Sequence, residues 1–512
     1  MAVTAGSVLK QSFKFSLVNV LAKSISFPVN IIIAAVVAPG DYGVISLVGL
    51  WTLYFTYINP GLVLAASREI PHRLGQKDET GASFAQNLSF TTDLAWISVA
   101  AIAYLLSAFL RTDMRMRGMF ILGAVAFFVT SIQSDLFTYN YARQNFSKAA
   151  KANVIGAIVA PLVTVGALYF LNIFAIPLGT IVGALATIAY YSFVVGTRVK
   201  LTFQLAALKR LLCVGIPLSL LRFAYWGYRL VDRTIVANFL PMEQLGLYTY
   251  ALNMATSLFV VFGDFSSVLQ PMIWKRMSEH EGHIHDLSEI RSVVVYLSLG
   301  VAVAISLLQL AFFALTHLVV RKYTPAIPVF YLLAFNEVFL IVGSIPSTIM
   351  LSSRVNQQTL NTMAWVVGLV LNAFAGYEVV HLGYGIIGIA CVTIGTQLLL
   401  ALTLFILVRD KIAPSRAEFM RLLGVVFAPL AVSAALTACF YFGLSLRPVP
   451  YVVYGLVLVL VVWVAVIGLF YRTYVSVAKI RSLYRSFKGL IAERMGRRSG
   501  GNRKADGHST EP

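Results

Sequence analysis

The sequence predicts an all-α polytopic membrane protein with about fourteen transmembrane helices, on three observations. Of its 512 residues, 59% are hydrophobic and only 12% are charged, about half the charged share of a typical soluble domain. The hydrophobic residues form long blocks, and about 20 apolar residues are enough for a helix to cross the hydrocarbon core of a bilayer. These blocks do not alternate between polar and apolar residues, which argues against the strands of a β-barrel.

The predicted spans follow one another along the chain, each an apolar block that ends at a polar break. The first block follows Lys10 and Lys14, is too long for a signal-peptide core and predicts a retained helix. The spans are 12–36, 43–66, 84–110, 115–140, 154–172, 174–196, 211–239, 246–274, 292–319, 326–352, 362–381, 384–408, 419–443 and 451–471.

The net charge of +19 is explained by membrane topology rather than by nucleic-acid binding. With the N-terminus inside, the inner loops and the two termini hold about 30 Lys and Arg residues, and the outer loops hold about 6. This asymmetry predicts that both termini lie in the cytoplasm. The basic tail at 472–512 predicts an amphipathic helix on the anionic leaflet, followed by a disordered end.

Two pairs of segments about 200 residues apart resemble each other and predict an internal repeat. "AAVVAPGDYGVISL" resembles "VANFLPMEQLGLYTY", and "RQNFSKAAKANVIG" resembles "RVNQQTLNTMAWVVG". Both halves start on the same side, so the repeat is parallel, and such repeats place a substrate site at their interface. The predicted units are two six-helix lobes at 1–200 and 201–410, two extra spans at 411–471, and the basic tail.

The seventh span, "LLRFAYWGYRLVDRTIVANFL", carries charge in the middle of the membrane. At about 100° per residue, Arg222, Arg229 and Arg233 fall on one stripe about 40° wide, with Trp226 at its edge. Asp232 lies about 80° away and can neutralise one of them at most.

The first span carries a polar stripe of its own, with Asn19, Lys23 and Asn30 among its members. Because charge at the bilayer centre costs about 3 kcal/mol, these stripes must face each other, water or a ligand. They predict a cationic cavity between the lobes that suits an anionic ligand, and phosphate matches the arginine fork.

The alternative is that each arginine pairs with a carboxylate of another helix. The candidates are Asp93, Asp135, Asp264 and Glu337. Asp232, Asp264, Glu337 and Asp135 are also candidates for ion coupling. The "NPG" at 59–61 is expected to interrupt the second span.

No enzymatic function is expected, because the sequence contains no GxxxxGK[ST], HExxH or GxSxG motif. The three cysteines, Cys213, Cys391 and Cys439, lie in or beside apolar spans and form no metal-binding pattern. We therefore expect no catalytic residue, no metal and no cofactor.

Four stretches of the sequence resemble the polysaccharide-flippase (Wzx-type) family of the multidrug/oligosaccharidyl-lipid/polysaccharide (MOP) exporter superfamily. They are "AAVVAPGDYGVISLVGL", "RQNFSKAAKANVIG", "LKRLLCVGIPLSLLRFAYWGYRLVDRTIVANFLPMEQLGLYTYA" and "LGYGIIGIACVTIGTQ". The resemblance covers about residues 10–410 and implies export of undecaprenyl-diphosphate-linked oligosaccharide by alternating access, for exopolysaccharide, capsule or O-antigen biosynthesis. It also implies that the protein lies in the bacterial cytoplasmic (inner) membrane. It implies that Lys23, Arg222, Arg229 and Arg233 receive the diphosphate.

The partners that this function implies are the anionic lipid-linked oligosaccharide, membrane lipids, and polysaccharide polymerase or assembly proteins, with no nucleic acid. Three alternatives stay open at this point. They are a lipid II flippase, an ion-coupled multidrug antiporter of the same superfamily, and a membrane-bound sugar polymerase or ligase.

Overall fold

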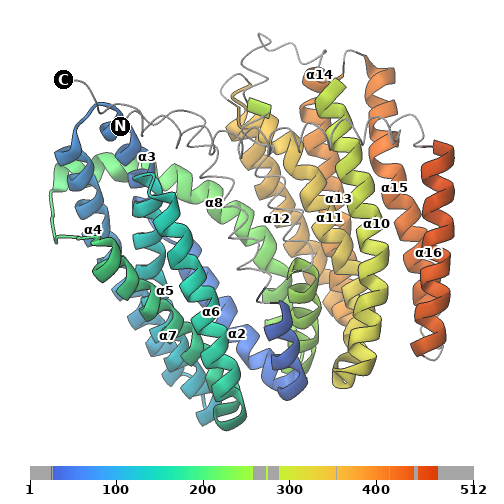
Figure 1. The fold of residues 1–512 in the computed structure, drawn as a ribbon, viewed down its shortest axis with the longest axis horizontal. Helices are drawn as coiled ribbons and strands as arrows, with labels where there is room; N and C mark the ends of the chain where they lie inside the picture. The colour runs from blue at the N-terminus through green and yellow to red at the C-terminus, as the bar shows by residue number, and fades with distance from the viewer. Residues whose placement is uncertain are drawn as a thin grey trace, which may run out of the picture.

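The computed structural model describes residues 25, 27–257, 273–274, 288–352, 355–413, 415–442 and 448–470. In these ranges the chain is helical and contains no strand, as the sequence predicts. Figure 1 shows two groups of helices, α2–α7 and α10–α16, with α8 running from one to the other. The principal helices are α2 (Pro39–Tyr57), α3 (Leu62–Gly75), α4 (Glu79–Phe109), α5 (Met114–Ala142), α6 (Phe146–Leu171), α7 (Ala175–Ala189), α8 (Leu205–Phe239), α10 (Ser288–Leu318), α11 (Ile327–Met350), α12 (Gln358–His381), α13 (Gly385–Leu407), α15 (Arg416–Phe442) and α16 (Pro448–Phe470).

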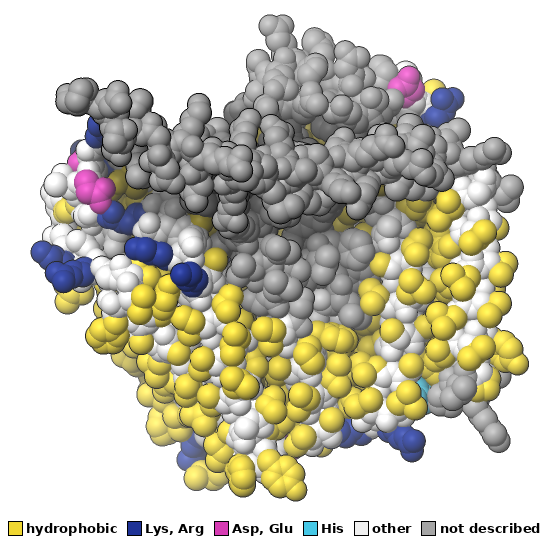
Figure 2. All heavy atoms as spheres, viewed as in Figure 1, with side chains coloured by type: hydrophobic (Ala, Val, Ile, Leu, Met, Phe, Trp, Pro, Cys, Tyr) yellow, Lys and Arg dark blue, Asp and Glu magenta, His cyan; other side chains and the backbone are white. Residues whose placement is uncertain are grey.

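The described helices form a multi-pass membrane protein. Nine of them are long and apolar enough to cross a bilayer, and the bent pair α2–α3 makes a tenth. Hydrophobic side chains cover much of the described surface, and Lys and Arg gather near its ends (Figure 2). Each predicted span overlaps a described helix, although only residues 25 and 27–36 of the first span and residues 246–257 and 273–274 of the eighth are described.

The second predicted span is interrupted at the "NPG" motif, as expected. α2 and α3 meet at an angle of 49°. The side-chain oxygen of Asn59 accepts a hydrogen bond from the Gly61 N–H at 2.9 Å, and Gly61 has a φ of 74°. Pro60 offers no N–H to continue the helix. A Cβ on Gly61 would lie 2.2 Å from the Gly215 carbonyl oxygen of α8, so glycine allows α8 to pass close to this break.

α8 has 35 residues and is therefore about 52 Å long. It packs against α12 and also against α3 and α2. Its side chains consequently contact both groups of helices, and the lobe boundary near residue 201 remains a prediction.

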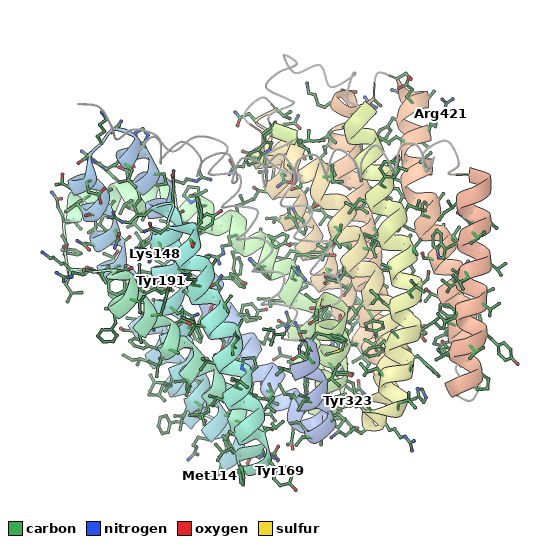
Figure 3. The ribbon with its side chains drawn as sticks, in the orientation of Figure 1. Met114, Lys148, Tyr169, Tyr191, Tyr323 and Arg421 are labelled. Carbon is green, nitrogen blue, oxygen red and sulfur yellow. The ribbon has the colours of Figure 1, made fainter. Side chains whose placement is uncertain are left out.

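The two groups meet at the end of the molecule that we call the tyrosine end, after Tyr42, Tyr250 and Tyr323. The ring of Tyr42 lies edge-on to those of Tyr250 and Tyr323, with centroids 6.1 and 5.9 Å away. Tyr323 also donates a hydrogen bond to the Val37 carbonyl at 3.1 Å. We call the opposite end, which carries Lys148 and Arg421, the basic end (Figure 3).

A reciprocal glycine contact closes the tyrosine end. A Cβ on Gly43 would lie 1.9 Å from the Met242 carbonyl oxygen, and a Cβ on Gly246 would lie 1.9 Å from the Pro39 carbonyl oxygen. Each glycine lies in the first part of its helix, in one of the two repeated segments. The repeat therefore brings its own equivalent turns into backbone contact.

We expect Gly43→Ala to destabilise the protein by about 3 kcal/mol, because the methyl group must push rigid backbone away. Gly49→Ala on the same helix is the control, since a Cβ there meets nothing within 4 Å. Thermal unfolding of the purified protein in detergent measures both variants. Equal midpoints for the two would contradict the proposed role of the glycine contact.

Candidate functional site

Arg222, in the middle of α8, lies over an aromatic surface. Its guanidinium carbon is 5.1 Å from the ring centre of Tyr57, the last residue of α2. The Tyr57 ring stacks on Trp226 with centroids 4.6 Å apart and planes 8° apart. The aromatic faces attract the cation and shield it from the bilayer. Arg222 is half-buried, and among the described residues no hydrogen bond or ion pair occupies its donors, which can therefore bind a ligand.

Arg229 lies two turns further along α8 and forms an ion pair with Glu337 of α11, at 2.9 Å. Their side chains are 20% and 7% exposed. The Thr256 hydroxyl donates a second hydrogen bond to the same carboxylate oxygen at 3.3 Å, and Trp226 lies 5.6 Å from the Arg229 guanidinium carbon. Arg229 is therefore paired with a carboxylate of another helix in this conformation, as the alternative interpretation of the sequence predicts for each arginine.

Arg233 and Asp232 interact electrostatically, but their side chains form no ion pair with each other in the described part of the chain. One Asp232 oxygen accepts a hydrogen bond from the Tyr248 hydroxyl at 2.7 Å, and the other accepts one from the backbone N–H of Arg233 at 2.6 Å. The Arg233 side chain donates to the Arg229 carbonyl at 3.3 Å, and its Nε is buried without a partner in the described structure. Arg233 thus retains a donor that a ligand or water can use.

A cavity of about 420 Å³ lies between α3, α8, α11 and α12. Its volume is within the range of about 300–1,000 Å³ that is usual for small-ligand sites. Two of the described lining residues are basic and none is acidic. The lining consists of Leu64, Ser67, Arg68, Leu218, Leu221, Arg222, Tyr225, Leu340, Ser344, Ser347, Thr348, Leu351, Asn361 and Trp365.

The polar groups of this cavity, which we call the arginine cavity, come from both groups of helices. Arg68 projects from α3 and is exposed, whereas Arg222 projects from α8. The Ser347 hydroxyl donates to the Asn361 side chain at 3.0 Å. Tyr225 meets the buried Trp365 ring edge to face, with centroids 4.8 Å apart. Two guanidinium groups beside hydroxyls, an amide and aromatic rings can bind a phosphorylated polar headgroup.

The structure brings together only some of the residues that the sequence singles out. Arg222 lines the arginine cavity, and Asn30 is half-buried on the helix Phe27–Val36. Asp135 lies on α5, where it interacts with Asp93 and with no arginine of the described residues. The predictions for Asn19, Lys23 and Asp264 fall outside the described residues.

Most of the cavity residues escaped the sequence reasoning, among them Arg68, Asn361 and Trp365. Arg68 directly follows the predicted second span, so the sequence predicts that it is one of the basic residues of an inner loop. The bend at Asn59–Gly61 turns α3 toward α8 and places Arg68 at the cavity. The "NPG" motif is the sequence signal that could have identified Arg68, because an interruption of a helix changes the direction of the residues that follow it.

Comparisons with known proteins agree with this architecture. A family model described as polysaccharide biosynthesis protein matches residues 32–308, which is more than half of the chain. A search of curated proteins finds no match.

The fold resembles solved transporters. An inward-facing multidrug resistance MATE family transporter of the MOP superfamily aligns with a TM-score of 0.63 at 14% identity, over 78% of this chain and 96% of that one. The lipid II flippase MurJ in an inward closed conformation aligns with a TM-score of 0.65 at 12% identity, over 90% and 99%. An outward-facing MATE transporter aligns with a TM-score of 0.52 at 16% identity, over 81% and 97%. The chain therefore has the fold of MOP transporters.

We expect Arg229→Ala to destabilise the protein by about 3–5 kcal/mol, because Glu337 would be left buried without its cation. The double variant Arg229→Met, Glu337→Leu should recover most of this loss, since it removes both charges. Thermal unfolding in detergent measures the cycle. Arg409→Ala, which removes an exposed pair with Asp410, should cost less than about 1 kcal/mol. A double variant as unstable as Arg229→Ala would argue against the pair.

Proposed function

The chain belongs to the polysaccharide biosynthesis protein family, and on that basis we propose that it is a flippase for an undecaprenyl-diphosphate-linked oligosaccharide. The observation that carries the proposal is the arginine cavity, whose described lining includes Arg68 and Arg222 but no carboxylate. Guanidinium groups bind phosphate oxygens through paired hydrogen bonds, so two of them suit a diphosphate.

The location of the cavity supports transport by alternating access. It lies between helices of the two groups, and the Gly43 and Gly246 contacts close the tyrosine end. The better alignment with the inward-facing MATE structure than with the outward-facing one is in keeping with this arrangement. In the proposed cycle the headgroup enters from the basic end, the glycine contacts separate, and the headgroup leaves at the tyrosine end.

The cations of α8 provide a path for the headgroup. Arg222, Arg229 and Arg233 succeed one another over about 16 Å of helix. Arg222 is available at the cavity, whereas Arg229 is held by Glu337. We propose that an arriving diphosphate displaces Glu337 from Arg229 as the two groups of helices move. This displacement would prevent the arginine from being left buried without an anion at any stage.

The cavity also weighs against the multidrug alternative. Arg68 and Arg222 repel a cationic drug and attract an anion. A lipid II flippase would need the same phosphate chemistry, so the sugar must be identified by experiment. We further propose that the basic end faces the cytoplasm, that the membrane is the bacterial inner membrane, and that a polysaccharide polymerase or assembly proteins receive the product.

Deletion of the gene, followed by analysis of lipid-linked sugars, tests this function. We expect completed oligosaccharide to accumulate on the inner leaflet while the surface glycan is lost. Normal surface glycan in the deletion strain would overturn the assignment. Accumulation of lipid II instead would identify the other flippase.

We expect Arg68→Ala and Arg222→Ala each to weaken binding of a polyprenyl-diphosphate sugar by about ten- to a hundred-fold, the usual value of a charged hydrogen bond. Binding to the purified protein in nanodiscs measures this loss. Lys148→Ala is the control, because Lys148 is exposed on α6 and does not line the cavity. Unchanged binding in both arginine variants would remove the arginine cavity as the headgroup site.

A further inference from the structure

Asp93 of α4 and Asp135 of α5 form a buried pair that the proposed transport path does not use. Each residue is 5% exposed, and their two carboxyl groups interact electrostatically across the contact between α4 and α5. Two buried carboxylates that lie close together repel each other, so a proton shared by the pair is favoured. Two of their oxygens, Asp93 Oδ1 and Asp135 Oδ2, are buried without a partner in the described structure. The pair therefore has unused capacity to bind a proton.

No cation in the described residues neutralises this pair. The electrostatic partners of each aspartate are the other aspartate and Tyr139, one turn further along α5. From α3, Ala66 and Ile70 pack on this region and are apolar. The charge of the pair can thus change only by gaining or losing a proton.

A series of polar side chains leads from the basic end to the pair. Tyr139 exchanges a hydrogen bond with Ser89 of α4 at 3.0 Å, one turn before Asp93. One turn nearer the basic end, Gln86 accepts a hydrogen bond from Arg143 at 2.8 Å. At the surface, Arg143 also donates to Ser83 at 2.9 Å.

The same guanidinium of Arg143 pairs with Glu79, which is exposed. From Arg143 to Asp135 the series covers about 12 Å of helix. We call these residues (Glu79, Ser83, Gln86, Ser89, Tyr139 and Arg143) the polar ladder.

The ladder ends at the aspartates. Toward the tyrosine end, the next fully buried side chains of α4 and α5 include Ile97, Ala100 and Phe127, which are apolar. A buried polar series that opens at one end and stops at two carboxyl groups is costly in a membrane, and such groups mark proton relays. We propose that Asp93 and Asp135 form a proton-binding site that exchanges with the aqueous phase at the basic end through the polar ladder.

The chemistry is simple protonation. A proton from water forms an O–H bond on one carboxylate oxygen, and the charge of the pair becomes less negative by one. The site lies within one group of helices and is separate from the arginine cavity. Proton binding does not depend on the identity of the transported molecule; only its coupling to transport depends on the proposed function.

Infrared titration of the full chain in nanodiscs, with no substrate present, tests the site. We expect the wild-type protein to lose the absorption of a buried protonated carboxyl group as the pH rises from about 4 to about 9. Asp93→Asn and Asp135→Asn should each reduce and shift that change, because each removes one of the two interacting carboxyl groups. Asp410→Asn, at an exposed carboxylate, should leave it intact.

A purely structural hydrogen bond between the helices would give a carboxyl absorption that does not change with pH. That result in the wild-type protein overturns the proposal, and it needs no variant to fold. A wild-type change that persists unaltered in both asparagine variants also overturns it.

The polar ladder has a separate kinetic test. Tyr139→Phe should leave the amount of titrating carboxyl unchanged but slow its exchange with solvent by about a hundred-fold, since it removes a hydroxyl from the path. Tyr141→Phe is the control, because Tyr141 is 47% exposed and lies outside the ladder. Equal exchange rates in the two variants would exclude this path.

Discussion

A charged side chain inside a bilayer must be offset, and α8 meets this constraint in three different ways. Arg229 has a carboxylate partner in Glu337. Arg233 donates to the carbonyl of Arg229. Arg222 lies on the ring of Tyr57 and borders the arginine cavity. Because an uncompensated charge costs several kcal/mol, α8 must remain between the elements that supply these partners. Its position then places the cavity between the two groups of helices.

The internal repeat provides the complementary contact. Its two turns meet at the tyrosine end, where Gly43 and Gly246 each approach a carbonyl oxygen of the other turn. Backbone contacts of this kind form only where a side chain is absent. The close approach gives van der Waals packing, which stabilises helix association in lipid. The glycine contacts themselves involve no charged group, and the hydrogen bond from Tyr323 to the Val37 carbonyl at the same end is between uncharged groups. These contacts can therefore separate without leaving a charge uncompensated. This property suits a surface that opens and closes.

The two sites that we propose have opposite charge and different locations. The arginine cavity is lined from both groups of helices, so movement of the groups changes its shape. The Asp93–Asp135 pair lies between α4 and α5 of one group, where such movement leaves the two aspartates in contact. Separation of this kind keeps an anionic headgroup away from the carboxyl groups, which would repel it.

The sequence by itself determined the helical membrane fold, the break at Asn59–Gly61 and the single stripe formed by Arg222, Arg229 and Arg233. Each of these follows from hydropathy, local backbone chemistry or the angle between residues of one helix, which short stretches of sequence specify. Only the tertiary structure decided that Glu337 pairs with Arg229, that Arg68 and Trp365 share a cavity with Arg222, and that Asp93 meets Asp135. These contacts join helices distant in sequence, and the packing of apolar surfaces with no periodic signal sets which faces meet.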